Sequence, residues 1–225
     1  MTGEDAQLWG PQTERAVANV GLIAGPLPPD LIAAIVAIKI EAAAVNARGG
    51  VIDDGTAEAI RAAGDQILAG DLATQFPVDV FQTGSGTSSN MNVNEVLSRL
   101  ASDRSAHPVH PNDHVNASQS SNDVFPSAIR IAALLRVRRT LVPALEHLHA
   151  RLAALSAAHA DTVKLGRTHL MDAVPMTFGQ EVGGWARAVE LTLPLIAAAG
   201  ERLHELALGG TAVGNTSFDD CEAFT

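Results

Sequence analysis

Apolar residues recur at the spacing of an amphipathic helix along most of this sequence. In the first half, the pattern predicts helices at 31–47, 56–68 and 88–102. Asp30 is the expected N-cap of the first helix, because its carboxylate can accept hydrogen bonds from the free backbone N–H groups of the first turn. Residues 105–119 contain two prolines and no periodicity, so we interpret them as a loop.

The second half contains two long stretches of helical periodicity. The first runs from 124 to about 160, and its apolar stripe consists of Leu141, Leu145, Leu148, Leu152 and Leu155. After a loop at about 166–175, Thr177 and Gln180 form the capping box of a second helix that reaches about residue 208. Two antiparallel helices of roughly 45 Å cannot bury such broad apolar faces by themselves, so further helices are needed, from this chain or a neighbour.

These elements predict an all-α fold whose bundle core is completed by oligomerisation. A small helical N-terminal domain is expected at 1–119, followed by part of a long-helix bundle at 120–225, in which 215–225 is atypical. The composition agrees with a packed fold, because 47% of the residues are hydrophobic and 18% are charged.

Charge and cysteine content exclude several classes of partner. The formal net charge of −10 argues against nucleic acid and against a polybasic membrane contact. No apolar run is long enough to span a membrane, and the first residues show no signal peptide. The single cysteine, Cys221, favours a reducing compartment, so we expect a cytoplasmic protein.

Chemistry concentrates first in residues 84–90, where small and polar residues lead into a predicted helix. A helix start offers unpaired N–H groups and a positive dipole end, which suit a carboxylate or a phosphate. For Ser85 and Thr87 alone, a turn that caps the helix would be explanation enough. Three asparagines follow in the helix start, however, and asparagine is a poor helix former, which favours a polar end that faces a ligand.

Ser120, Ser121 and Asn122 repeat this chemistry ahead of another predicted helix. Capping that helix requires one hydroxyl or amide, and three are present. The surplus therefore favours contact with a substrate.

Three histidines lie between these two segments, at positions 107, 110 and 114. Their spacing would suit metal ligation from a helix, but neighbouring prolines disfavour that helix, and no cysteine or glutamate-rich cluster accompanies them. No metal site is therefore expected. His110, with Asn112 and Asp113, is more typical of a capped turn that could also contact an anion.

A third segment, 166–172, contains Thr168 and His169 in a loop ahead of a helix start. A solitary histidine in a loop is usually just solvated. The neighbouring hydroxyl favours a second interpretation, in which His169 is a general acid or orients a water molecule.

Taken together, these motifs resemble those of the class II, iron-independent fumarate hydratases of the fumarase/aspartase superfamily. Four segments carry the resemblance: 82–96, 110–126, 166–180 and 208–214. Aspartate ammonia-lyases resemble the chain less well. They typically carry Gln at the position of His169 and Ser-Thr-Asn-Asp at 120–123.

The resemblance implies reversible hydration of fumarate to (S)-malate, a reaction of the tricarboxylic acid cycle, through an aci-carboxylate and without a metal or organic cofactor. It implies that the substrate-binding residues are Ser85, Thr87, Ser120, Ser121, Asn122 and Thr168. His169 would be the catalytic acid or water-orienting residue, and His110, Asn112 and Asp113 would form a second dicarboxylate site. It also implies a homotetramer in which each active site combines segments from three subunits.

One signature of the family, Gly-Ser-Ser-x-Met-Pro-x-Lys-x-Asn-Pro, does not occur in these 225 residues. In the family it supplies the catalytic base serine and a substrate-binding lysine, and the family's members are longer than this chain. We therefore expect a truncated or frame-shifted product with little hydratase activity of its own. Two alternatives stay open: an incompetent fragment that binds dicarboxylate or assembles with complementing subunits, and an aspartate ammonia-lyase.

Overall fold

A computed structural model describes residues 7–20, 23–70 and 72–214 of the chain. Its contacts define two compact units, each described by itself below: unit 1 comprises Met1–Ala132 and Glu205–Thr225, and unit 2 comprises Ala133–His204. This division falls inside a helix and differs from the boundary expected between 119 and 120. The assignment of folding domains stays a prediction.

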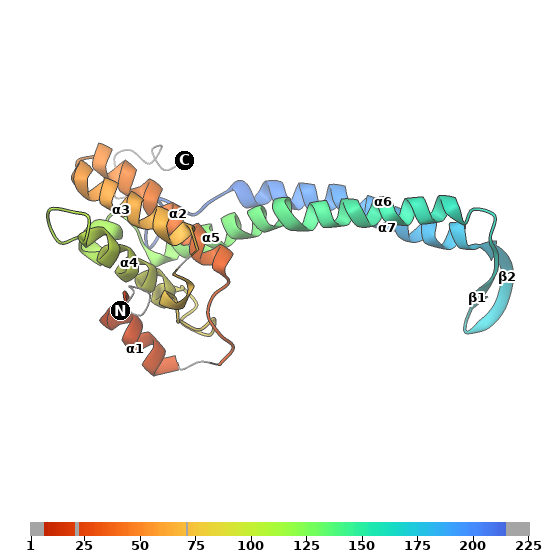
Figure 1. Ribbon diagram of the computed structural model, residues 1–225, viewed down its shortest axis with the longest axis horizontal. Helices are drawn as coiled ribbons and strands as arrows, with labels where there is room; N and C mark the ends of the chain where they lie inside the picture. The colour runs from red at the N-terminus through yellow and green to blue at the C-terminus, as the bar shows by residue number, and fades with distance from the viewer. Residues whose placement is uncertain (1–6, 21–22, 71, 215–225) are drawn as a thin grey trace. The chain divides into compact units, whose positions relative to one another are not determined.

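The helices of unit 1 are α1 (Pro11–Val20), α2 (Pro29–Arg48), α3 (Asp54–Leu68), α4 (Thr87–Ser102) and most of α5 (Ser121–Arg136) (Figure 1). The three helices predicted in the first half are therefore confirmed, whereas α1 was not predicted. Asp30 lies in the first turn of α2, and the N-cap is Pro28, so the expected cap is wrong. The expected loop at 105–119 contains one π-helical turn, η2 (Pro111–Val115).

The core of unit 1 lies among α2, α3 and α4. Its most deeply buried apolar residues include Ile35, Val36, Ile60, Val93, Val96 and Leu97. Full burial of one such side chain contributes roughly 1.5–3 kcal/mol. Helices α2 and α3 approach closely at Gly64, where an added Cβ would lie 2.5 Å from the side chain of Ile40.

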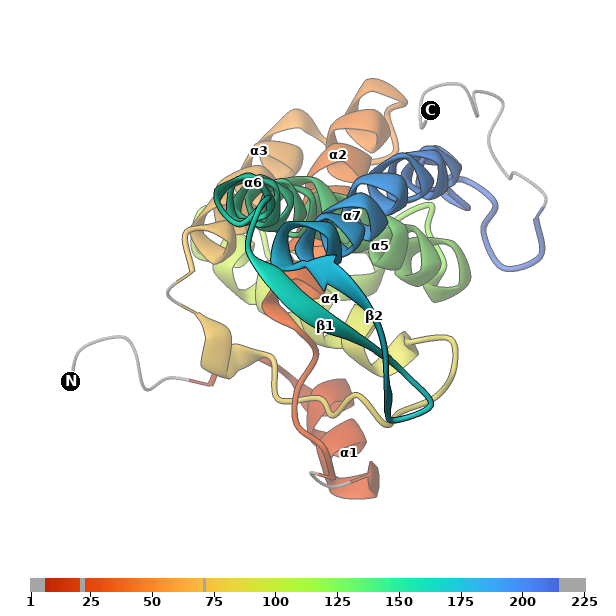
Figure 2. The same ribbon diagram turned by 90° about the vertical axis from the view of Figure 1, so that its right-hand side faces the viewer.

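Unit 2 contains a π-helical turn, η3 (Val137–Leu141), then α6 (Val142–Ala158), β1 (Val163–Thr168), β2 (Met171–Thr177), α7 (Phe178–Glu201) and η4 (Arg202–His204). Strands β1 and β2 form an antiparallel hairpin where the sequence predicted a loop, so that expectation is wrong. Figure 2 faces the hairpin and shows the twist of its two strands. A bulge between Leu165 and Arg167 depends on Gly166, since a Cβ there would lie 2.7 Å from the carbonyl oxygen of Val174.

Helices α6 and α7 run side by side in unit 2 (Figure 1). The predicted capping box is confirmed, because Thr177 Oγ1 accepts from the Gln180 N–H at 3.0 Å, and Gln180 Oε1 accepts from the Thr177 N–H at 2.9 Å. Close packing at this end requires Gly179, whose Cβ would lie 2.6 Å from the carbonyl oxygen of Ser156.

Large apolar side chains are exposed along η3 and the same pair of helices, including Leu141, Leu148, Leu155, Trp185, Leu191 and Leu195. This agrees with the expectation that two helices cannot cover their own apolar faces. Within the described ranges, no helix combines the length and the apolar composition needed to cross a membrane.

Candidate active site

The loop that leads into α4 is closed by one side chain, Gln82. Its Nε2 donates to Ser89 Oγ at 2.8 Å and to the carbonyl oxygen of Asp79 at 2.9 Å, while its Oε1 accepts from the Ser89 N–H at 3.1 Å. The amide side chain thereby satisfies one of the free N–H groups at the start of α4. This contact fixes residues 83–88 as a compact turn ahead of the helix.

Gly86 is the N-cap of α4, and it brings the starts of α4 and α5 together. Its φ of +64° lies in the left-handed region, which glycine adopts without steric strain. A Cβ at this position would overlap with the ring of Phe125, in the first turns of α5. The two helix starts therefore lie in contact because this residue has no side chain.

Three hydroxyl groups, from Ser85, Thr87 and Ser121, join the two helix starts, and we call them the hydroxyl cluster. Ser85 Oγ and Ser121 Oγ each lie 2.8 Å from Thr87 Oγ1. Each hydroxyl has one proton to donate, so two contacts within the cluster leave one O–H to donate outward. The positive dipole ends of α4 and α5 meet at the same place, which favours an anion.

Ser120 and Asp123 cap α5 reciprocally. Ser120 Oγ accepts from the Asn122 N–H at 3.2 Å, and Asp123 Oδ1 accepts from the Ser120 N–H at 3.0 Å. The second carboxylate oxygen of Asp123 accepts from the Thr211 N–H at 2.9 Å, which ties residues 208–214 to this helix start. The side chain of Asn122 is exposed beside the cap.

The asparagines of α4 are buried and hydrogen-bonded inside unit 1, which accounts for them without a ligand. Asn90 and Asn94 are buried, and their Nδ2 groups both donate to Asn116 Oδ1 at 3.1 Å. Asn92 is buried as well, and it donates to the carbonyl oxygen of Gln75 at 3.0 Å. Their poor helix propensity is offset by tertiary hydrogen bonds inside unit 1.

Sequence reasoning missed Lys39, which lies beneath these amides. Its Nζ donates to Asn116 Oδ1 at 2.8 Å, and the residue has 0% exposure. Burial lowers the pKa of Lys39 to about 7, although the nearby charge of Asp123 acts in the opposite direction. A single lysine within the apolar stretch of a predicted helix was the signal available.

The three residues expected at a second dicarboxylate site lie together at η2, where His110 is the N-cap and Asn112 and Asp113 are in the first turn. His110 Nδ1 accepts from the backbone N–H groups of Asn112 and Asp113 at 3.3 and 3.1 Å, as expected for a capped turn. The same nitrogen lies 2.9 Å from Asp113 Oδ2. His110 Nδ1 therefore makes its contacts within the turn itself.

Thr168 and His169 lie in unit 2, at the tip of the hairpin. Thr168 pairs with Met171, and the two residues between them, His169 and Leu170, have φ values of +47° and +62°. Two positive φ values are the requirement of a type I′ turn, which favours Asn-Gly. All four residues are exposed, and Leu170 is 100% exposed. The structure thus brings Ser85, Thr87 and Ser121 together, while Thr168 and His169 are described within unit 2 alone.

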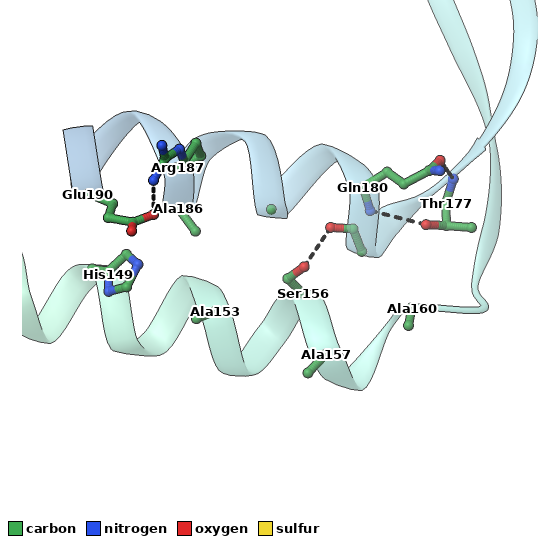
Figure 3. A pocket seen from close by; sticks show the side chains of 12 residues that line it. His149, Ala153, Ser156, Ala157, Ala160, Thr177, Gln180, Ala186, Arg187 and Glu190 are labelled. Carbon is green, nitrogen blue, oxygen red and sulfur yellow. Dashed lines mark hydrogen bonds and ion pairs between the residues drawn. The ribbon is translucent and has the colours of Figure 1, made fainter.

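A groove of about 620 Å³ lies between α6 and α7 (Figure 3). Small residues line most of it, and a pair of charged residues, Arg187 and Glu190, lies 2.8 Å apart at one end. Sequence reasoning assigned no chemistry to this groove. In the part of the chain that the structure describes, no group of three or more potential metal-ligating side chains is found.

A family model described as lyase matches residues 1–222. The chain belongs to this lyase family. Among relatives, it is 49% identical over 213 residues to the class II fumarate hydratase of Nitrosomonas europaea, covering 92% of this chain and 46% of the relative. It is 47% identical over 216 residues to the corresponding protein of Bordetella parapertussis, covering 93% of this chain and 47% of the relative.

A solved structure of the class II fumarase of Schistosoma mansoni has a TM-score of 0.91 and 37% identity, covering 97% of this chain and 48% of that one. This lyase-family chain therefore has a mostly helical, fumarase-like fold, and it resembles the class II fumarate hydratases along nearly all of its length. It spans about half the length of the relatives that it matches.

Proposed function

We propose that this chain supplies the carboxylate-binding part of a class II fumarate hydratase, which interconverts fumarate and (S)-malate. The observation that carries the proposal is the hydroxyl cluster, which lies between the starts of α4 and α5. Ser85, Thr87 and Ser121 offer an outward O–H, and the helix starts offer N–H groups and positive dipole ends. A carboxylate of a small dianion is complementary to such a set of donors.

The reaction explains why donors are needed at this place. In the dehydration direction a proton leaves the carbon next to a carboxylate, and its electron pair moves onto the carboxylate oxygens as an aci-carboxylate. The carbon–oxygen bond then breaks, and the hydroxyl group leaves with a proton as water. Donors that are fixed before the reaction stabilise the added charge without reorganisation, so they favour the intermediate over malate. We assign this role to the hydroxyl cluster, with Ser120 and Asn122 beside it.

Thr168 and His169 are proposed to act at the hydroxyl end of the substrate, where His169 would be the acid or would orient the water. The hairpin tip supports a site that is completed by other subunits. It combines two non-glycine residues in left-handed conformations with a fully exposed Leu170, and such strain persists where surrounding structure stabilises it. Together with the exposed apolar faces of α6 and α7, this favours the homotetramer of the family.

The remaining parts of the proposal concern His110, cofactors and location. His110, Asn112 and Asp113 are proposed as a second dicarboxylate site, because all three side chains are exposed at one turn. No cofactor is part of the proposed reaction. The reducing compartment favoured by the cysteine content would be the cytoplasm.

Binding of dicarboxylate by the 225-residue chain tests the proposal. Fumarate is titrated into the protein and followed by calorimetry and by the backbone amide NMR signals of Thr87 and Ser121. Thr87→Val removes the hydroxyl that contacts both serines, and a hydrogen bond to a charged group contributes about 1.5–3 kcal/mol, so affinity should fall about tenfold or more. Thr140→Val, which removes an exposed hydroxyl in unit 2, is the matched control.

Unchanged affinity in Thr87→Val, or an equal loss in Thr140→Val, would contradict the assignment of the cluster. Turnover is measured separately by the loss of fumarate absorbance. We expect slow turnover at most, since the signature with the base serine is not among these residues. Ammonia release from aspartate would support the ammonia-lyase alternative, and binding without turnover would support the incompetent fragment.

A further inference from the structure

Lys39 is the largest of the fully buried side chains in the described part of the chain. Burying an ammonium group is costly unless its hydrogen bonds and its charge are compensated. Its direct acceptor is a neutral amide, Asn116 Oδ1, at 2.8 Å, and Asp123 supplies the opposing charge without a hydrogen bond to it among the described contacts. Stability alone is therefore a poor reason for a lysine at this position.

The acceptor of Lys39 is shared with α4. Asn116 Oδ1 also accepts from Asn90 and Asn94, so three N–H donors converge on an oxygen that has two lone pairs. Among the described atoms, neither Asn90 Oδ1 nor Asn94 Oδ1 has a donor. Asn116 Oδ1 thus connects α2, the first turns of α4 and the turn at 116–120.

Helix α2 holds that turn at a second point. Asn46, which lies seven residues after Lys39 and on the same face of the helix, donates to the carbonyl oxygen of Ala117 at 2.9 Å. Within the turn, Asn116 Nδ2 donates to the carbonyl oxygen of Gln119 at 3.2 Å. Ser121, whose hydroxyl contacts Thr87, follows directly after this turn. The position of Ser121 relative to α4 therefore depends on the hydrogen bonds that Lys39 and Asn46 of α2 make to this turn.

We propose that Lys39 is a positioning residue of the hydroxyl cluster: through Asn116, its ammonium group holds the start of α4 and the turn before α5 at the spacing that lets Thr87 and Ser121 bind one carboxylate. This inference rests on the proposed function, because it names what fixes the same site. Lys39 touches no substrate and acts through Asn116.

The charge of Lys39 adds a property that a purely structural residue would not have. A dianion bound at the hydroxyl cluster favours the ammonium form of Lys39. Without ligand, burial lowers the pKa of Lys39 to about 7. The polar groups around the ammonium are Asn116 of the turn, Asn90 and Asn94 of α4, and Asp123 of α5, of which Asp123 carries charge. Dicarboxylate affinity should therefore be higher below neutral pH and fall as the pH rises above about 7.

Lys39→Met in the 225-residue chain tests the role, with Arg48→Met as the matched control. Arg48 is exposed on the same helix, so each variant removes one positive charge from α2. Arg48→Met leaves the hydrogen bonds to Asn116 Oδ1 intact, whereas Lys39→Met removes one of them. We expect fumarate to bind about tenfold more weakly to Lys39→Met, with the fall in affinity above neutral pH reduced. Its melting temperature should be unchanged or raised, because a buried charge is replaced by an apolar side chain of similar size. Arg48→Met should retain both the affinity and its pH profile.

The outcomes separate the positioning role from the proposed function. If the native chain binds fumarate and Lys39→Met binds it equally well, the positioning role is overturned and the proposed function stands. If the native chain does not bind fumarate, the proposed function fails, and hydrogen exchange then decides the positioning role. Faster amide exchange in residues 84–90 and 118–123 of Lys39→Met, with α3 unchanged, would support it, and unchanged exchange in both segments would overturn it.

Discussion

The contact between Gly86 and Phe125 gives a sharp prediction about what holds the two helix starts together. In Gly86→Ala the residue must keep a φ of +64°, which costs about 1–2 kcal/mol in an L-residue. The new Cβ also overlaps with the ring of Phe125, and overpacking of this kind costs about 1–3 kcal/mol. The free energy of unfolding of unit 1 should therefore fall by about 2–5 kcal/mol, a large share of the roughly 5–15 kcal/mol of a typical domain.

Urea unfolding followed by tryptophan fluorescence measures this loss in unit 1. Trp9 belongs to unit 1 and Trp185 to unit 2, so a Trp185→Phe background lets Trp9 report on unit 1 alone. With a slope of about 2 kcal/mol per molar urea, the midpoint should fall by about 1–2.5 M without a change of slope.

Gly84→Ala is the control for this prediction. It lies in the same loop, but no described atom would come within 4 Å of its new Cβ and no positive φ strains it, so its midpoint should shift little. In a Phe125→Ala background, Gly86→Ala should still lower the free energy of unfolding through its positive φ, but no longer through overlap with the ring of Phe125. Equal midpoints for Gly84→Ala and Gly86→Ala would refute the reasoning.

Three further predictions concern groups away from the hydroxyl cluster. Burial alone would raise the pKa of Asp79, but its backbone hydrogen bonds outweigh this and lower the pKa from 3.8 to about 2. Between about pH 4 and 2 the carboxylate of the unfolded chain gains its proton before the native one does, so stability is lost there, and Asp79→Asn should flatten this loss in acid unfolding. In Glu95→Gln the amides of α1 should exchange with solvent faster while those of α3 do not, because this carboxylate accepts from three backbone N–H groups at the start of α1. Thr177→Ala should lower the stability of unit 2 by about 1 kcal/mol, measured with Trp185 fluorescence, and an unchanged midpoint would show that the capping box contributes nothing.

The helices were predictable where burial on one face imposed a period, as in α2, α3 and α4. Helix α1 was missed because its start is held by Glu95, a contact between residues more than 80 positions apart. The hairpin was missed because side chains on both of its faces are exposed, so its strands show no alternation of apolar and polar residues. A pattern that depends on burial cannot reveal a strand pair that unit 2 leaves uncovered.

The candidate site was predictable as far as its motifs lie at helix starts. Ser85, Thr87 and Ser121 were expected to share a ligand, and the structure brings their hydroxyls within hydrogen-bonding distance of one another. The roles of Lys39 and Asn116 could not be found in the same way. Their hydrogen bond joins residues 77 positions apart. Neither hydrophobic periodicity nor a capping motif in the sequence predicts a contact over that separation.

The hairpin tip has a consequence for attempts to stabilise this protein. Replacing its two turn residues by Asn-Gly would suit the left-handed conformations and would relieve about 1–2 kcal/mol at each position. The same change would delete the imidazole of His169, so an optimal turn sequence is incompatible with the role proposed for that residue. Leu170→Gly separates the two demands, because it relaxes the backbone at the second position and keeps His169. Redesign that optimises the turn sequence alone would replace His169. Leu170 is the turn position that can be changed while His169 is kept.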